Sequence, residues 1–171
     1  MRRPAAALGS AAFFLAAPCM VAGLVPWLIT GWKMPAPESA FAVARVAVGV
    51  SLSVVAVLLL VRNFIRFVAE GRGTPSPTAP PERLVVGGDY RLVRNPMYVA
   101  VVAVLLGQAL IFGSASLLIY AVLVWAVMAA FVHYYEEPRL RRRYGNDYED
   151  YRRGVPAWIP LSRRHGNTRS R

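Results

Sequence analysis

NPMYVAVVAVLLGQALIFGSASLLIYAVLVWAVMAAFVHYY, residues 95–135, contains no aspartate, glutamate, lysine or arginine. As a single helix it would be about 60 Å long, twice the ~30 Å hydrocarbon thickness of a bilayer. A turn is expected at Phe112, Gly113 and Ser114, because glycine tolerates turn geometry and serine can cap the helix that follows. The stretch therefore predicts two membrane-spanning helices that form a tight hairpin.

The rest of the chain is also rich in apolar sequence. Of its 171 residues, 56% are hydrophobic and only 17% are charged, and the mean hydropathy is +0.41. Residues 4–32 carry no charge, and residues 46–61 form a second apolar stretch that residues 39–44 extend, with Arg45 interrupting it. Because a spanning helix needs roughly 20 apolar residues, the sequence predicts an all-α integral membrane protein with about four transmembrane helices.

Residues 1–23 also admit a secretory signal peptide, since Arg2 and Arg3 precede an apolar region. The apolar run continues well past the usual signal length, which favours a membrane span. Cys19, the only cysteine, has no partner for an internal disulfide.

Basic residues predict the orientation, because those in short loops are retained on the cytoplasmic side. Arg2 and Arg3 precede the first span, six arginines lie between the second and third spans, and ten follow the fourth. The opposite side has Lys33 and Glu38, with Arg45 at its edge. We therefore expect a multi-pass cell-membrane protein with both termini and the long middle loop in the cytoplasm.

The formal net charge of +11 might suggest a nucleic-acid partner. The basic residues flank the spans, however, and no nucleic-acid motif accompanies them, so topology and anionic lipid headgroups explain the charge. No Walker-type loop, Gly-x-Gly-x-x-Gly motif or Cys/His cluster occurs, and His133 and His165 are too few to form a metal site alone. We expect neither nucleic acid nor metal as a ligand.

Composition divides the chain into four parts. Residues 1–68 contain the first two spans, and residues 69–89 are a Gly/Pro-rich cytoplasmic loop. Residues 90–161 hold the hairpin and nearly every polar residue suited to chemistry, and residues 162–171 are a basic tail expected to be disordered.

An amphipathic helix is expected after the fourth span. Pro138 suits a first helical turn, and Leu140, Tyr144, Tyr148 and Tyr151 then recur at spacings of four, four and three. Tyrosines suit the headgroup zone, so we expect an interfacial helix; an ordinary solvated charged helix is the alternative.

Polar groups gather where the hairpin should begin and end. Arg94 and Asn95 precede its first helix, and Glu136 and Glu137 follow its second. Arginine and glutamate at a membrane boundary can simply reach the headgroups. Their occurrence together favours a functional site, because an antiparallel hairpin with a short turn must bring Arg94 and Glu136 near each other.

Residues 82–160 resemble the superfamily of isoprenylcysteine carboxyl methyltransferases and phospholipid methyltransferases, which are integral membrane enzymes. The resemblance lies in LVVGGDYRLVRNPMY, then a hydrophobic hairpin, then EEPRLRRRYGNDYEDYRRGVPAWIP. The family pattern has Leu-Val, Gly-x-Tyr, Arg-His-Pro-x-Tyr, the hairpin, Glu-Glu-x-x-Leu, Gly-x-x-Tyr-x-x-Tyr and Val-Pro-x-x-(Ile or Leu)-Pro in the same order.

The resemblance implies S-adenosylmethionine as cofactor, bound on the cytoplasmic side, and a lipophilic small molecule or lipid as methyl acceptor. Aromatic faces and a carboxylate would stabilise the sulfonium cation of S-adenosylmethionine. Arg94 would position an anionic acceptor or set the local field, Glu137 could accept a proton from an amine or thiol, and residues 144–160 would close over the site. The implied cofactor-binding residues are Glu82, Arg83, Leu84, Val85, Tyr90, Asn95, Pro96, Met97, Tyr98 and Glu136.

Two departures from the family pattern bear on the substrate. Asn95 replaces the histidine of Arg-His-Pro and cannot titrate, which excludes a proton role at that position. Val132 stands where the prenylcysteine enzymes place an arginine that meets the substrate, so a prenylcysteine carboxylate is not assured as acceptor.

Other functions remain open at the level of sequence. Phospholipid N-methylation and thiol S-methylation are alternatives within methyl transfer. A membrane scaffold or a small transporter subunit is the non-enzymatic alternative. Transport sites tend to need polar residues near the bilayer midplane, where Gln108 is the main candidate, whereas the polar cluster lies at the cytoplasmic edge. A reductase on a related scaffold would need a nicotinamide site, of which the sequence shows no sign.

The arginine distribution makes a topology prediction. With cysteine placed by Ala36→Cys or Thr168→Cys, only position 36 should react with an impermeant thiol reagent in intact cells. Labelling at position 168 but not at position 36 would contradict the predicted orientation.

Overall fold

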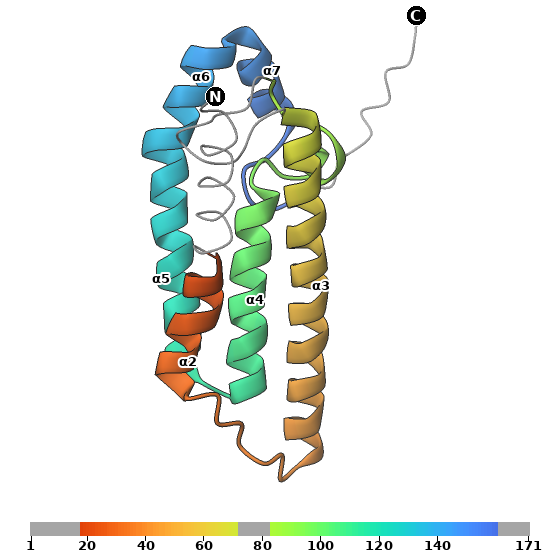
Figure 1. Ribbon diagram of the computed structural model, residues 1–171, viewed down its shortest axis with the longest axis vertical. Helices are drawn as coiled ribbons and strands as arrows, with labels where there is room; N and C mark the ends of the chain where they lie inside the picture. The colour runs from red at the N-terminus through yellow and green to blue at the C-terminus, as the bar shows by residue number, and fades with distance from the viewer. Residues whose placement is uncertain (1–17, 72–82, 161–171) are drawn as a thin grey trace, which may run out of the picture.

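The hairpin of residues 95–135 forms in the computed structural model, which describes residues 18–71 and 83–160 (Figure 1). Helix α4 (Pro96–Phe112) is followed by α5 (Ala115–Phe131). Gly113 adopts a φ of 60°, the left-handed conformation that favours glycine, and the Ser114 hydroxyl accepts a hydrogen bond from the Leu117 N–H. The turn therefore lies at the predicted residues, for the predicted reasons.

Helix α3 (Ala40–Gly71) runs along α4 and makes the most extensive helix–helix contact among the described elements (Figure 1). Small residues permit this approach. A Cβ atom built on Gly49 would lie 2.7 Å from the Gly107 carbonyl oxygen, and one built on Gly107 would lie 2.8 Å from that of Gly49. The two backbones are thus in direct contact, as is common for helices packed in a membrane.

A short apolar helix lies against the hairpin, formed by the π-helical turn η1 (Met20–Leu24) and α2 (Val25–Thr30). Pro26 has no N–H to donate to Ala22, four residues earlier. Gln108 on α4 supplies a donor instead, with its Nε2 2.7 Å from the Ala22 carbonyl oxygen. Pro26 therefore leaves the Ala22 carbonyl oxygen available, and this helix is joined to the hairpin by the hydrogen bond from Gln108 to that oxygen.

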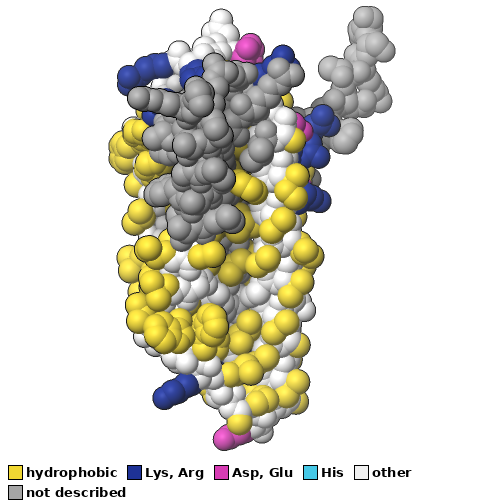
Figure 2. Space-filling view, in the orientation of Figure 1, with side chains coloured by type: hydrophobic (Ala, Val, Ile, Leu, Met, Phe, Trp, Pro, Cys, Tyr) yellow, Lys and Arg dark blue, Asp and Glu magenta, His cyan; other side chains and the backbone are white. Residues whose placement is uncertain are grey.

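Two of the described helices are long and apolar enough to cross a membrane, Ala40–Phe67 and Ala115–Tyr144, while Met20–Thr30 and Pro96–Phe112 are shorter apolar helices. Only 11% and 17% of the most apolar windows of the two long helices are buried, so neither is the core helix of a soluble protein. Figure 2 shows hydrophobic side chains along the middle of the molecule and charged side chains gathered at its two ends. This distribution is that of a protein associated with a membrane.

The structure after α5 differs from the single amphipathic helix that the sequence predicts there. A π-helical turn, η3 (Val132–Glu136), continues α5 into α6 (Glu137–Tyr144), so Pro138 lies in a first turn without a break before it. The wider π turn relieves the clash between a proline ring and the carbonyl four residues earlier. The single amphipathic helix expected here is instead two helices, because Gly145, with φ 54°, separates α6 from α7 (Asn146–Gly154).

The tyrosine stripe of this region also faces the protein rather than the surroundings. Tyr148 is only 3% exposed, and the Tyr151 hydroxyl donates a hydrogen bond to the Tyr90 carbonyl oxygen. Because α7 folds back over the end of the bundle, these side chains pack inward (Figure 1).

The contact between α3 and α4 predicts a sensitivity to added volume. Gly107→Ala should lower the free energy of unfolding by about 1–3 kcal/mol, because its new methyl group has backbone within 3 Å. Gly23→Ala is the matched control, since nothing lies within 4 Å of its Cβ position. Thermal unfolding in detergent measures both, and equal stability of the two variants would contradict the packing described.

Candidate functional site

Arg94 lies at the centre of the polar cluster. It stands between the 3₁₀ turn η2 (Gly88–Arg91) and the start of α4. Its Nη2 is 2.9 Å from Glu137 Oε1, and its Nη1 donates to the Tyr148 hydroxyl at 3.3 Å. The side chains of Arg94 and Glu137 are 12% and 11% exposed, so this ion pair is almost fully enclosed.

The two adjacent glutamates have different partners. Tyr98, in the first turns of α4, donates a hydrogen bond to Glu136 Oε1 at 2.6 Å. Consecutive residues in a helix point about 100° apart, which is why Glu137 meets Arg94 while Glu136 meets Tyr98. The sequence placed Arg94 near Glu136; the structure brings both glutamates to the cluster and pairs Arg94 with Glu137.

The C-terminal segment 155–160 is fastened over the start of α4. The backbone N–H of Arg94 donates to the Pro156 carbonyl at 2.8 Å. Asn95 bonds the Ala157 carbonyl twice, from its backbone N–H at 3.2 Å and from its side-chain Nδ2 at 3.1 Å. These bonds hold the segment as a lid on the side of α4 where Arg94 and Tyr98 lie.

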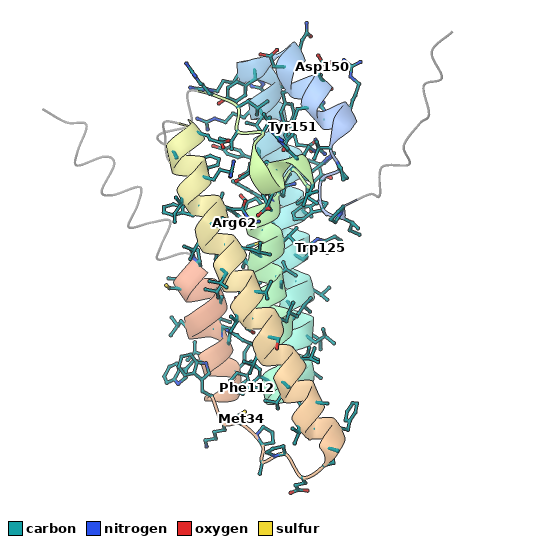
Figure 3. The ribbon with its side chains drawn as sticks, turned by 90° about the vertical axis from the view of Figure 1, so that its right-hand side faces the viewer. Met34, Arg62, Phe112, Trp125, Asp150 and Tyr151 are labelled. Carbon is teal, nitrogen blue, oxygen red and sulfur yellow. The ribbon has the colours of Figure 1, made fainter. Side chains whose placement is uncertain are left out.

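Aromatic rings continue this lid toward the apolar part of the bundle. The Trp158 ring lies 6.4 Å from that of Tyr98 and 6.2 Å from that of Trp125, which projects from α5. Figure 3 places Trp125 nearer the middle of the molecule than Tyr151, and Met34 and Phe112 at the opposite end. The lid therefore reaches from the polar cluster to the apolar flank of the hairpin.

Two buried donors in the cluster have no hydrogen-bond partner among the described residues, the Tyr90 hydroxyl and Arg94 Nε. Tyr90 is 6% exposed, and burial raises the pKa of its hydroxyl, which therefore stays protonated and able to donate. Unpaired buried donors are costly. Their presence fits a site that receives a ligand with acceptor atoms.

The structure also places the remaining predicted residues. Arg83 is exposed, Leu84 half-buried and Val85 buried, in the irregular segment before η2. Pro96 is buried in the first turn of α4, and Met97 beside it is half-buried. Glu82 lies outside the described residues.

Several members of the site were not named individually from the sequence. Tyr148, Tyr151 and Trp158 lie within residues 144–160, which were expected to close over the site, whereas the pair Asn63 and Asp89 that joins α3 to η2 was not anticipated. A signal existed for α7, because a helical stripe of tyrosines next to a charged face also fits packing against protein. The described residues contain no group of three or more His, Cys, Asp or Glu side chains that could hold a metal ion.

In the part of the chain that the structure describes, an enclosed ion pair and a lid lie at the end of an apolar helical hairpin opposite its turn, as in a membrane-associated protein with a polar site at one end. Residues 44–147 match the family profile described as phospholipid methyltransferase. The chain belongs to that family, and residues 94–98, 136 and 137 all lie inside the matched region.

Two curated relatives are similar to part of the chain. The protein-S-isoprenylcysteine O-methyltransferase of Schizosaccharomyces pombe is 35% identical over 79 residues, 46% of this chain and 33% of the relative. Protein-S-isoprenylcysteine O-methyltransferase B of Arabidopsis thaliana is 31% identical over 80 residues, 46% of this chain and 40% of the relative. The match thus spans well under half the length of either relative. No solved structure matches the chain.

The Arg94–Glu137 pair predicts strongly non-additive stability effects. Arg94→Met or Glu137→Met alone should each cost about 3 kcal/mol of unfolding free energy, because either leaves an enclosed charge without its partner. The double variant should be more stable than at least one single variant, since it leaves neither charge. Thermal unfolding of the four proteins in detergent measures the coupling, and simply additive losses would show that the ion pair contributes nothing.

Proposed function

We propose that this chain is an S-adenosylmethionine-dependent methyltransferase that methylates a lipophilic acceptor taken from the membrane. The observation that carries the proposal is the cluster at the open end of the hairpin, where Arg94–Glu137 and Tyr98–Glu136 lie beneath the lid 155–160. Membership of the phospholipid methyltransferase family supports it. An enclosed set of charges beneath a lid favours a functional site over a non-catalytic scaffold.

The residues fit the proposed cofactor. The Glu136 carboxylate and the rings of Tyr98 and Tyr90 suit a sulfonium cation, and the unpaired donors of Tyr90 and Arg94 suit a ligand with acceptor atoms. When bound, S-adenosylmethionine supplies an electrophilic methyl group. The remaining residues proposed to hold it are Glu82, Arg83, Leu84, Val85, Asn95, Pro96 and Met97.

Arg94 and Glu137 are the proposed catalytic residues. An anionic acceptor would compete with Glu137 for the Arg94 guanidinium, which would orient it. A neutral amine or thiol acceptor would instead pass its proton to Glu137. The lid excludes water from either reaction, because residues 156 and 157 are bonded to the backbone at the start of α4.

The acceptor class follows from where the site lies. Trp158 and Trp125 link the cluster to the apolar flank of α5, so a lipid-like molecule is the acceptor we propose. The family description names phospholipid as a second candidate acceptor, while the two relatives are named as O-methyltransferases of protein S-isoprenylcysteine, an acceptor that would present a carboxylate. Val132, 4% exposed, supplies no charge for such a carboxylate.

We further propose a four-span cell-membrane topology with both termini and the site in the cytoplasm. The two long helices are Ala40–Phe67 and Ala115–Tyr144, and α4 must cross with α5 because the two form one hairpin. Residues 1–68 would form the first two spans, 69–89 the cytoplasmic loop, and 90–161 the methyltransferase core with α6 and α7 at the interface. Charge asymmetry between the two ends supports this arrangement (Figure 2).

A transfer assay tests the function directly. Purified protein in lipid nanodiscs is given S-adenosylmethionine with a labelled methyl group and one acceptor at a time: a prenylated cysteine, phosphatidylethanolamine or a lipophilic thiol. We expect label in at least one acceptor. Loss of turnover in Arg94→Lys with cofactor affinity retained would indicate an anionic acceptor, since lysine cannot reproduce the guanidinium fork. No transfer to any acceptor would count against the proposal.

Cofactor binding makes a further prediction. Glu136→Gln should weaken S-adenosylmethionine binding by about 10-fold or more, because it removes a charge-assisted contact. Asp150→Asn is the matched control, since Asp150 is a solvent-exposed acid on α7 whose side chain is 71% exposed. Calorimetric titration of both folded variants decides the point, and equal affinities would remove Glu136 from the cofactor site.

A further inference from the structure

Asn63 is a buried amide in the second half of α3, next to the exposed Arg62. It is 2% exposed and lies within the candidate span Ala40–Phe67. Its Nδ2 donates two hydrogen bonds of 2.8 Å, one to the Leu59 carbonyl and one to Asp89 Oδ2. A buried amide is tolerated only when it is bonded, and here one of its bonds leaves α3 for the turn that precedes Arg94.

Asp89 is the second residue of η2 and connects that turn to α3. Its carboxylate accepts hydrogen bonds from Asn63 and from Arg62, whose side chain is 60% exposed. The hydrogen bond from Arg62 is the main reason that the pKa of Asp89 lies below its usual value. The buried amide thus holds a carboxylate that stays ionised.

The same aspartate organises the backbone that leads to the site. Its carbonyl accepts hydrogen bonds from the N–H groups of Leu92 at 2.9 Å and Val93 at 3.1 Å. Tyr90 follows Asp89 directly, and its ring lies 6.4 Å from that of Phe67 on α3. A displacement of Asp89 would therefore move Tyr90 and the residue after Val93, which is Arg94.

Helix α3 holds this segment from one side, and α7 and the lid hold it from the other. On one side Asn63 bonds Asp89; on the other Tyr151 bonds the Tyr90 carbonyl, and the Arg94 N–H bonds the lid. Figure 3 shows Arg62 on α3 and Tyr151 on α7 in the same half of the molecule. On the α3 side, the hydrogen bond from Asn63 is the buried polar contact, beside the Arg62 ion pair and the Phe67–Tyr90 ring contact.

We propose that Asn63 is a positioning residue for methyl transfer: through Asp89 it fixes the η2 turn and so the places of Tyr90 and Arg94. The inference rests on the proposed function and gives the second half of α3 a part in it. The buried bond to Asn63, rather than the exposed pair with Arg62, holds the turn, because exposed ion pairs contribute little and a buried bond to a charged group contributes more.

Four variants distinguish the contribution of Asn63 from that of Arg62, the two side chains that bond the Asp89 carboxylate. Asn63→Leu and Asp89→Ala both delete the buried bond, and each should weaken S-adenosylmethionine binding by about 10-fold. Arg62→Ala removes only the exposed partner and should stay within about 2-fold of the parent. Asp89→Asn loses the charge but keeps an oxygen that can accept from Asn63, so its loss should be clearly smaller than that of Asp89→Ala. Rescue by Asp89→Asn distinguishes positioning through this bond from a general loss of structure.

Hydrogen exchange provides a readout that does not depend on the cofactor. The amides of residues 92–95 should exchange at least about 10-fold faster in Asn63→Leu and Asp89→Ala than in the parent, while those of residues 104–110 in α4 stay protected. If the parent fails to bind S-adenosylmethionine, the proposed function falls and exchange alone decides the positioning claim. Parent-like exchange at residues 92–95 in both deletion variants, or equal losses in Arg62→Ala and Asn63→Leu, would overturn the inference.

Discussion

The enclosed ion pair between Arg94 and Glu137 is the constraint on which the rest of the site depends. It joins Arg94, two residues before α4, to the first residue of α6 at 2.9 Å, with both side chains nearly buried. Charges in such surroundings must be paired, so the pair requires the two ends of the hairpin to meet. Tyr98 and Glu136 then face each other as a consequence of the same meeting.

Contacts from α3 and from the lid hold the segments on either side of this ion pair. The α3 helix reaches the η2 turn through Asn63 and Asp89, and the lid reaches the start of α4 through Asn95. Between them stand the unpaired donors of Tyr90 and Arg94. A polar site built in this way lies at one end of an apolar bundle, which suits the proposed water-soluble donor and membrane-dissolved acceptor.

The hairpin was predictable because its determinants are local: the length of the uncharged run, the conformational freedom of Gly113 and the capping hydroxyl of Ser114. The sequence predicted which residues gather at the site but not which of them pair. A rotation of the helix by one residue decides whether Glu136 or Glu137 meets Arg94. Tyrosine spacing predicted the amphipathic stripe but placed it against the headgroups, whereas Tyr148 and Tyr151 pack against the protein. The break at Gly145 had a signal, because glycine before asparagine commonly separates two helices.

Binding of the methyl donor to the parent protein is the most direct test of this account. Calorimetric titration in lipid nanodiscs should show saturable binding of S-adenosylmethionine and none of a reduced nicotinamide cofactor, because the Glu136 carboxylate and the neighbouring tyrosines suit a sulfonium cation, and the reduced nicotinamide ring carries no cation. Saturable binding of the nicotinamide cofactor alone, or of neither compound to folded protein, would contradict the account.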